Sequence, residues 1–197
     1  MPKNVAILLF DEVEVLDFAG PFEIFSVTGL RAEGEAPFNV YTVAEKSGTI
    51  SARNHLVVTP HYTLDNCPPP DIFLIPGGSG SRAAMRNPAV IEWTQRQHRN
   101  TELTLSVCTG ALVLATAGLL DGLQATTHYG AYDLLGELAP QATVVRGVRY
   151  VDNGKVITSA GVQAGMDMAL HVVARLLGED AARETAQYIE YEWQPQV

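Results

Sequence analysis

Short apolar runs alternate along the chain with segments whose hydrophobic residues recur at helical spacing. This alternation predicts an α/β fold in which helices cover both faces of a mostly parallel sheet. The last two predicted strands form a hairpin, because an Asn-Gly dipeptide, which favours tight turns, separates them. The predicted strands are residues 5–10, 38–43, 71–75, 103–107, 143–145, 148–151 and 156–159, and the predicted helices are residues 22–28, 88–98, 111–117, 163–177 and 181–191.

The clearest helical pattern lies in the last third of the chain, over residues 163–177. The apolar residues at helical spacing there are Met166, Leu170, Val173 and Leu177. A glycine follows the pattern, as is common just beyond the C-terminus of a helix. The segment therefore predicts a long helix whose apolar face packs against the core.

Three unusual segments each follow a predicted strand. Residues 11–17 follow the first strand, the glycine-rich run 76–80 follows the third, and Cys108 follows the fourth. In open α/β sheets the functional crevice lies beyond the carboxyl ends of the strands. The order of elements therefore predicts that these three segments meet at one site.

Cys108 lies where an apolar strand runs into an alanine-rich helix, in the sequence Ser-Val-Cys-Thr-Gly. Such a turn holds a side chain clear of the sheet, as in the G-x-S-x-G nucleophile elbow, although Ser106 replaces the first glycine of that motif. The N–H groups and the dipole of the helix favour the thiolate form of the cysteine. A small buried hydrophobic residue is the other interpretation of a free cysteine.

Asp17 is an acidic residue with apolar neighbours, in the run Leu-Asp-Phe-Ala-Gly-Pro. One interpretation is an N-cap, whose carboxylate accepts hydrogen bonds at the start of a helix. The other is a general acid/base beside Cys108. If the two groups are in contact they cannot both ionise cheaply, so we expect a coupled pair that shares a proton.

The glycine-rich run 76–80 allows the backbone to approach a ligand closely. The N–H groups of Gly77 and Gly78, with that of Thr109, are candidate donors for an oxyanion-type hole. The run lacks the spacing of a phosphate-binding loop, and a tight strand-to-helix turn is the simpler interpretation. His128 follows a short apolar stretch and is a further candidate for the same crevice.

Composition excludes several classes of function. The formal charge of −9 and the lack of a Lys/Arg stripe argue against a nucleic-acid partner. No apolar run approaches the roughly 20 residues of a membrane-spanning helix, and the histidines form no metal-ligand cluster. The first apolar run is short and unlike a signal peptide, and the two cysteines form no disulfide framework. We therefore expect one cytoplasmic domain over residues 1–197, without a metal site.

With these residues in place, the chain resembles the DJ-1/PfpI superfamily, in the branch close to isonitrile hydratases and to the amidotransferase-like domains of AraC-type regulators. The resemblance implies a flavodoxin-like three-layer sandwich and usually a homodimer. It also implies that Cys108 is the cysteine of a nucleophile elbow and Asp17 its acidic partner. The matching stretches are residues 5–10, 16–23, 75–78, 107–111, 126–128 and 158–161.

One position departs from the peptidase-like members, which carry His directly after the cysteine where this chain has Thr109. Without that adjacent base, the Cys-His activation of an amide-cleaving protease is not expected. Asp17, Thr109 and the Leu-Asp-Phe-Ala-Gly-Pro run look most like isonitrile hydratases. The implied reaction is hydration of a small-molecule isonitrile through a thioimidate on Cys108, with Asp17 as proton carrier and no cofactor.

Other functions use the same cysteine. A glyoxalase-like or deglycase activity would begin with attack of Cys108 on an aldehyde, giving a hemithioacetal. A redox or ligand sensor would oxidise a thiol of low pKa to sulfinic acid, without turnover. The sensory domain of a transcription regulator is a further alternative, although no basic helix-turn-helix segment is found in the sequence.

Overall fold

The computed structural model describes residues 1–30 and 36–195. Within these residues, seven strands form one sheet in the order β10-β11-β7-β6-β1-β2-β5. Every neighbouring pair is parallel except β10 and β11, which form the predicted hairpin. The strands are β1 (Lys3–Leu9), β2 (Phe38–Ala44), β5 (Tyr62–Thr63), β6 (Ile72–Ile75), β7 (Leu103–Val107), β10 (Tyr150–Asp152) and β11 (Val156–Ser159).

Short strands outside this sheet form two small ladders. The first pairs β3 (Ile50–Ser51) with β4 (Val57–Val58), and the second pairs β8 (Gln124–Ala125) with β9 (Thr143–Val144). The α-helices are α1 (Val15–Val27), α2 (Ser81–Ala84), α3 (Pro88–Asn100), α4 (Gly110–Thr116), α5 (Tyr132–Leu138), α6 (Ala164–Leu177) and α7 (Glu179–Tyr188). Residues Arg53–His55 and Tyr129–Ala131 form single turns of 3₁₀-helix.

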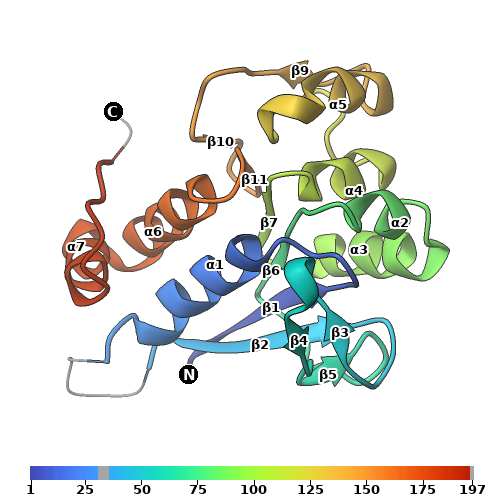
Figure 1. Ribbon diagram of the computed structural model, residues 1–197. Coiled ribbons are helices and arrows are strands. Elements are labelled where there is room, and N and C mark those ends of the chain that lie inside the picture. Colours follow the sequence, from blue (N-terminus) through green and yellow to red (C-terminus); the bar gives the residue numbers. More distant parts are fainter. Residues whose placement is uncertain (31–35, 196–197) are drawn as a thin grey trace.

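Helices cover both faces of the sheet (Figure 1). One core lies between the sheet and α1, α6 and α7, and a second core lies between the sheet and α2, α3, α4 and α5. The strands supply both cores by alternation, because Val5 and Ile7 of β1 face the first and Ala6 and Leu8 face the second. This three-layer arrangement confirms the predicted α/β class.

The strand order also confirms the flavodoxin-like topology. The parallel strands β2-β1-β6-β7-β11 follow the order 2-1-3-4-5 that defines it. After β1, the chain places β2 on one side of it and then β6, β7 and β11 on the other side. The point between β1 and β6 is therefore a topological switch point, and in such sheets ligands bind there, beyond the carboxyl ends of the strands. The segments that follow β1 and β6 are hydrogen-bonded to each other there, since Glu14 N–H donates to Gly77 C=O at 2.9 Å.

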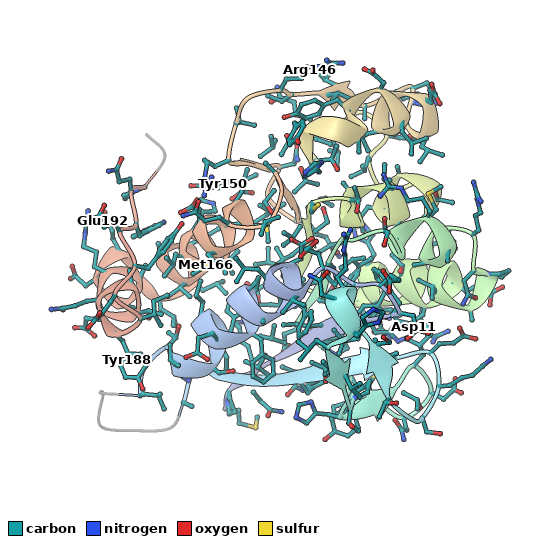
Figure 2. The ribbon with its side chains drawn as sticks, in the orientation of Figure 1. Asp11, Arg146, Tyr150, Met166, Tyr188 and Glu192 are labelled. Atoms are coloured by element: carbon teal, nitrogen blue, oxygen red, sulfur yellow. The ribbon has the colours of Figure 1, made fainter. Side chains whose placement is uncertain are left out.

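Two predicted helices have different bounds in the structure. We expected a helix over residues 22–28, after Pro21, but α1 begins at Val15 and carries Pro21 inside it. A proline inside a helix removes one backbone hydrogen bond, and packing against α6 outweighs that loss. Met166 lies between the two helices (Figure 2), so close that a Cβ on Gly20 would stand 2.8 Å from its Cγ.

The C-terminal helices also differ in detail from the prediction. Leu177, expected to face the core, is the last residue of α6 and is 43% exposed. The last helix, α7, ends at Tyr188 rather than at residue 191. Among the described residues, we find no helix that has both the length and the apolar character to cross a membrane.

Candidate active site

Cys108 occupies the turn between β7 and α4 with a left-handed backbone, φ 56°. A non-glycine residue adopts this conformation at a cost of roughly 1–3 kcal/mol, so the surroundings must hold it there. Cys108 N–H donates to Ser159 C=O at 3.2 Å and to Ala160 C=O at 3.1 Å. Its C=O accepts a 2.7 Å hydrogen bond from Thr127 Oγ1. Both sides of the turn are therefore fixed from neighbouring segments.

Asp17 lies in the first turn of α1 and is completely buried. It is not the N-cap, because Glu14 holds that position without capping the helix through its side chain. The Asp17 side chain instead crosses to the loop after β6, where its Oδ2 accepts a 2.9 Å hydrogen bond from Gly77 N–H. Oδ1 is buried and has no hydrogen-bond partner of normal geometry among the described residues.

The structure brings the Asp17 carboxyl and the Cys108 thiol together, and the pKa of each is raised. Burial raises the pKa of Asp17 to about 7, although hydrogen bonds from Gly77 N–H and from the thiol act in the opposite direction. Burial and the Asp17 charge raise the pKa of Cys108 to about 12, against the hydrogen bond from Thr109 N–H. At pH values between these two pKa values, the coupled pair therefore holds one proton.

This electrostatic balance corrects one expectation. We expected the helix N–H groups to favour a thiolate, but Cys108 is 5% exposed, and the loss of hydration outweighs those donors. The pair needs an internal transfer of its shared proton, from sulfur to carboxylate, before the sulfur becomes a strong nucleophile.

The glycine-rich loop also differs from the expected oxyanion-type hole. Gly77 N–H is used by Asp17, and Gly78 N–H donates to Thr109 Oγ1 at 3.1 Å. Neither donor is therefore open to a substrate in this arrangement. A Cβ at Gly77 would stand 2.5 Å from Thr109 N and 2.9 Å from Asp17 Oδ2, so close approach of Asp17 to this loop requires glycine.

A pocket of about 370 Å³ opens above Cys108. Its lining brings together three of the residues predicted from the sequence, Gly78, Thr109 and His128, with Cys108 itself. Asp17 and Gly77 do not line the pocket and are hydrogen-bonded to each other next to it. The residues that line the pocket are Glu14, Arg53, Gly78, Ser79, Arg82, Cys108, Thr109, His128, Gly130 and Val162.

His128, a candidate from the sequence, lines the pocket above Cys108. Its Nδ1 accepts a 3.2 Å hydrogen bond from Gly130 N–H, so the neutral ring carries its proton on Nε2. A Cβ at Gly161 would stand 2.6 Å from His128 Cδ2 and 3.7 Å from Cys108 Sγ. The imidazole and the thiol therefore both lie beside Gly161.

Sequence reasoning missed the charged residues of the pocket, Glu14, Arg53 and Arg82. Arg82 has a recognisable signal, since it lies in the first turn after the glycine-rich loop at the carboxyl edge of the sheet. Arg53 has none, because it lies on a 3₁₀ turn that contacts Glu14 only through the tertiary fold, with 3.8 Å between the guanidinium and the carboxylate. In the described part of the chain, no group of three or more His, Cys, Asp and Glu side chains is placed to hold a metal ion.

Comparison with known proteins identifies the family. The model of the DJ-1/PfpI family matches residues 3–175. The chain belongs to the DJ-1/PfpI family. Its fold superposes on a crystal structure of a ThiJ/PfpI family protein from Pseudomonas syringae with a TM-score of 0.89 at 28% identity, over 100% of this chain and 78% of that one.

Two curated members of different function are similar to the chain. Isonitrile hydratase of Pseudomonas putida is 32% identical over 191 residues, which cover 97% of this chain and 79% of that protein. The HTH-type transcriptional regulator CdhR of Pseudomonas aeruginosa is 31% identical over 187 residues, 95% of this chain. The chain spans about half of the regulator, 54% of its length. The family therefore includes both an enzyme and a transcriptional regulator that are similar to this chain.

Proposed function

We propose that this protein is an enzyme that hydrates isonitriles to N-substituted formamides, with Cys108 as nucleophile and Asp17 as general acid/base. The observation that carries the proposal is the buried Asp17–Cys108 pair, in which a carboxyl with a pKa of about 7 adjoins a thiol beneath a small pocket. Similarity to isonitrile hydratase over nearly the whole chain supports the assignment. No step in this chemistry requires a cofactor.

In the first step, Cys108 Sγ bonds to the terminal carbon of R–N≡C. The thiol proton passes to Asp17 Oδ2 or to the unpartnered Oδ1, and Asp17 then delivers it to the same carbon. The product is the thioimidate Cys–S–CH=N–R, and Asp17 is left ionised. A carboxyl with a pKa near neutrality is suited to this exchange, because it gives and takes a proton at little cost.

In the second step, ionised Asp17 takes a proton from water while the hydroxide oxygen adds to the thioimidate carbon. Asp17 passes that proton to nitrogen, giving a tetrahedral adduct with one S–C, one C–O and one C–N bond. The C–S bond then breaks as the adduct's O–H proton returns to sulfur and the C=O forms. The net reaction is R–NC plus water to R–NH–CHO, with Cys108 and Asp17 restored.

His128 and the Thr109 backbone are the groups left to assist the adduct. Gly77 and Gly78 donate their N–H groups within the protein, so we assign them to positioning Asp17 and Thr109 rather than to binding the substrate. His128, whose Nε2–H has no hydrogen-bond partner among the described residues, is proposed to bind the oxygen or nitrogen of the adduct.

The alternative functions make different demands on Cys108. A redox sensor needs a thiol of low pKa, and burial shifts the pKa of Cys108 in the opposite direction. Aldehyde chemistry uses the same nucleophile and yields lactate from methylglyoxal rather than a formamide. A ligand-sensing role is supported by the similarity to CdhR, and it predicts binding in the pocket without turnover.

The decisive experiment measures formamide production from an aromatic isonitrile by the wild type, Cys108→Ala and Asp17→Asn. We expect turnover by the wild type, none above background with Cys108→Ala, and a loss of about 10²–10⁴-fold with Asp17→Asn. Cys67→Ala is the matched control, since Cys67 lies in a loop away from the pocket and should leave turnover unchanged. Absence of formamide with the wild type would reject the hydratase assignment, and lactate from methylglyoxal would then support the aldehyde reaction.

Three expectations from the sequence remain predictions: a homodimer, a single domain over residues 1–197 and a cytoplasmic location. Light scattering coupled to size exclusion tests the first. A mass of about twice 21.3 kDa would support it. A monomer at micromolar concentration would contradict it.

A further inference from the structure

Arg82 is a half-buried guanidinium at the mouth of the Cys108 pocket that has no carboxylate partner among the described residues. Its Nη1 lies 3.3 Å from Ser81 Oγ and 3.4 Å from Gly78 C=O. Ser81 Oγ in turn donates to Thr109 Oγ1 at 2.9 Å. The guanidinium is thus held through Nη1 against Gly78 and Ser81, while Nε and Nη2 have no hydrogen-bond partner among the described residues.

The charged side chains that line the pocket are two arginines and one glutamate, and the Asp17–Cys108 pair adjoins them with one negative charge above a pH of about 7. Arg53 and Arg82 are positive and Glu14 is negative, and the Glu14 carboxylate lies 3.8 Å from Arg53. Glu12, which Ser79 contacts at 3.3 Å, does not line the pocket. Arg82 is therefore the positive charge left without a partner among the described residues that line the pocket, in a chain whose net charge of −9 repels anions at longer range.

A guanidinium with open donors binds planar oxyanions through two parallel hydrogen bonds. A carboxylate fits this pocket better than a phosphate dianion, because Glu14 also lines the pocket and opposes a second negative charge. The volume of about 370 Å³ admits a small molecule that spans from Cys108 to the pocket mouth.

We propose that Arg82 selects substrates that carry a carboxylate, so that the preferred isonitriles are small isocyano acids. This inference rests on the proposed hydration for the identity of the reacting group. The carboxylate binds Arg82 at the mouth of the pocket, and the isonitrile carbon reaches Cys108 below it.

The first test compares 4-isocyanobenzoate with its methyl ester as substrates. Wild-type kcat/KM should be about tenfold or more higher for the acid, as expected for a hydrogen-bonded charge pair. Arg82→Gln should remove about tenfold or more of the acid's kcat/KM, through KM, and change that of the ester less than about twofold. Arg82→Lys should restore part of the loss. Arg86→Gln, an exposed arginine one turn further on, is the matched control.

A second test measures the effect of the Arg82 charge on the reactivity of Cys108, and it does not require that the protein hydrates isonitriles. The rates at which iodoacetate and iodoacetamide alkylate Cys108 are compared by peptide mass, with Cys67 as the reference thiol in the same molecule. Arg82→Gln should lower the iodoacetate-to-iodoacetamide rate ratio at Cys108 by about fivefold or more and leave the ratio at Cys67 unchanged.

The two tests separate the two proposals. Formamide from both substrates with equal kcat/KM, and an alkylation ratio that Arg82→Gln does not change, would overturn the carboxylate site and leave the hydratase function standing. No formamide from either substrate, with a ratio that falls in Arg82→Gln, would reject hydration and support the carboxylate site. An unchanged ratio at Cys108 overturns the site whether or not hydration occurs.

Discussion

Two aspartates at different places in the fold, Asp17 in the interior and Asp152 at the surface, show how this protein sets the charge of a carboxyl group. Asp17 accepts a hydrogen bond from Gly77 N–H and has no cationic partner among the described residues. Asp152, at the end of β10, lies 2.7 Å from His171 Nε2 and 3.1 Å from Arg175 Nη1, both on α6. Tyr150, which lies on the same strand and is labelled in Figure 2, stacks on His171 with 4.6 Å between ring centroids.

The pKa values of the two groups move in opposite directions. Burial raises the pKa of both carboxyls, but at Asp152 the hydrogen bonds from His171 and Gly154 and the charge of Arg175 outweigh it and hold the pKa below its ordinary value. At Asp17 burial prevails, and the nearby Glu14 charge adds to it. Burial alone therefore does not decide ionisation; the partners supplied by neighbouring elements do. Asp152 is kept ionised between β10 and α6, whereas the pKa of Asp17 is kept near neutrality, as the proposed proton transfer requires.

The largest expected effect concerns turnover through Asp17. Wild-type kcat/KM for an aromatic isonitrile should rise with pH through about 7, as the pair loses one of its two protons and the thiol gains a carboxylate acceptor. Asp17→Asn should lower kcat/KM by about 10²–10⁴-fold and abolish this rise. A pH–rate profile from pH 5 to 9 measures both effects. If kcat/KM of Asp17→Asn still rose with pH through about 7, the titration would belong to a group other than Asp17.

The second prediction uses the same substitution and measures stability. The folded-state pKa of Asp17 lies above its ordinary value of 3.8, so its contribution to stability is fully present below that value and is lost as pH rises through about 7. The amide that Asp17→Asn introduces does not titrate. The free energy of unfolding of Asp17→Asn relative to wild type should therefore increase by on the order of 1–3 kcal/mol between pH 5 and 8. Urea unfolding at several pH values measures this, and a constant difference would contradict the raised pKa.

Asp152→Asn should show the opposite dependence on pH. Because the folded-state pKa of Asp152 is lowered, its contribution is present at neutral pH and is lost as pH falls toward that pKa. We expect the substitution to lower the free energy of unfolding by about 1 kcal/mol at pH 7, since the group is partly exposed. The difference from wild type should narrow only below about pH 4, as the pH falls from the ordinary pKa of 3.8 through the lowered one. Urea unfolding at several pH values measures this difference in the free energy of unfolding. A difference that widens at low pH would contradict the lowered pKa of Asp152.

The smallest effect concerns the charge that faces Asp17. Glu14→Gln removes a negative neighbour that raises the pKa of Asp17. The ascending limb of the pH–rate profile should therefore move to lower pH, by less than about 1 pH unit. Glu12→Gln is the control, since Glu12 contacts Ser79 and does not line the pocket. Equal shifts in both variants would point to general surface charge rather than to Glu14.

Much of the site could be predicted from local sequence. The strand over residues 103–107 was predicted with its observed bounds, and the turn after it contains Cys108 in the expected place. The meeting of Asp17, the glycine-rich loop and Cys108 also followed, because parallel strands bring their carboxyl ends to one edge. The start of α1 did not, since Gly20 and Pro21 are helix breakers by local propensity, and close packing under Met166 overrides them.

The hydrogen-bond partners of the backbone donors and the placement of the charged side chains could not be predicted, because they depend on distances between segments that are far apart in the sequence. The N–H groups of Gly77 and Gly78 were predicted to bind substrate, but Asp17 and Thr109 side chains occupy them. Arg53 enters the pocket from a 3₁₀ turn distant in sequence from the strands that build the site. Such contacts form only once the layers pack.

The sequence by itself determined the alternation of strands and helices, the order of segments along the carboxyl edge of the sheet, and the chemistry of the side chains placed there. These follow from periodicity and residue type, which are local properties. Only the tertiary structure decided that the Cys108 thiol stays protonated and that, among the described residues, Asp17 lacks a cation and Arg82 lacks an anion. Ionisation and pairing depend on hydration and on distances of a few ångströms between elements, and folding sets both.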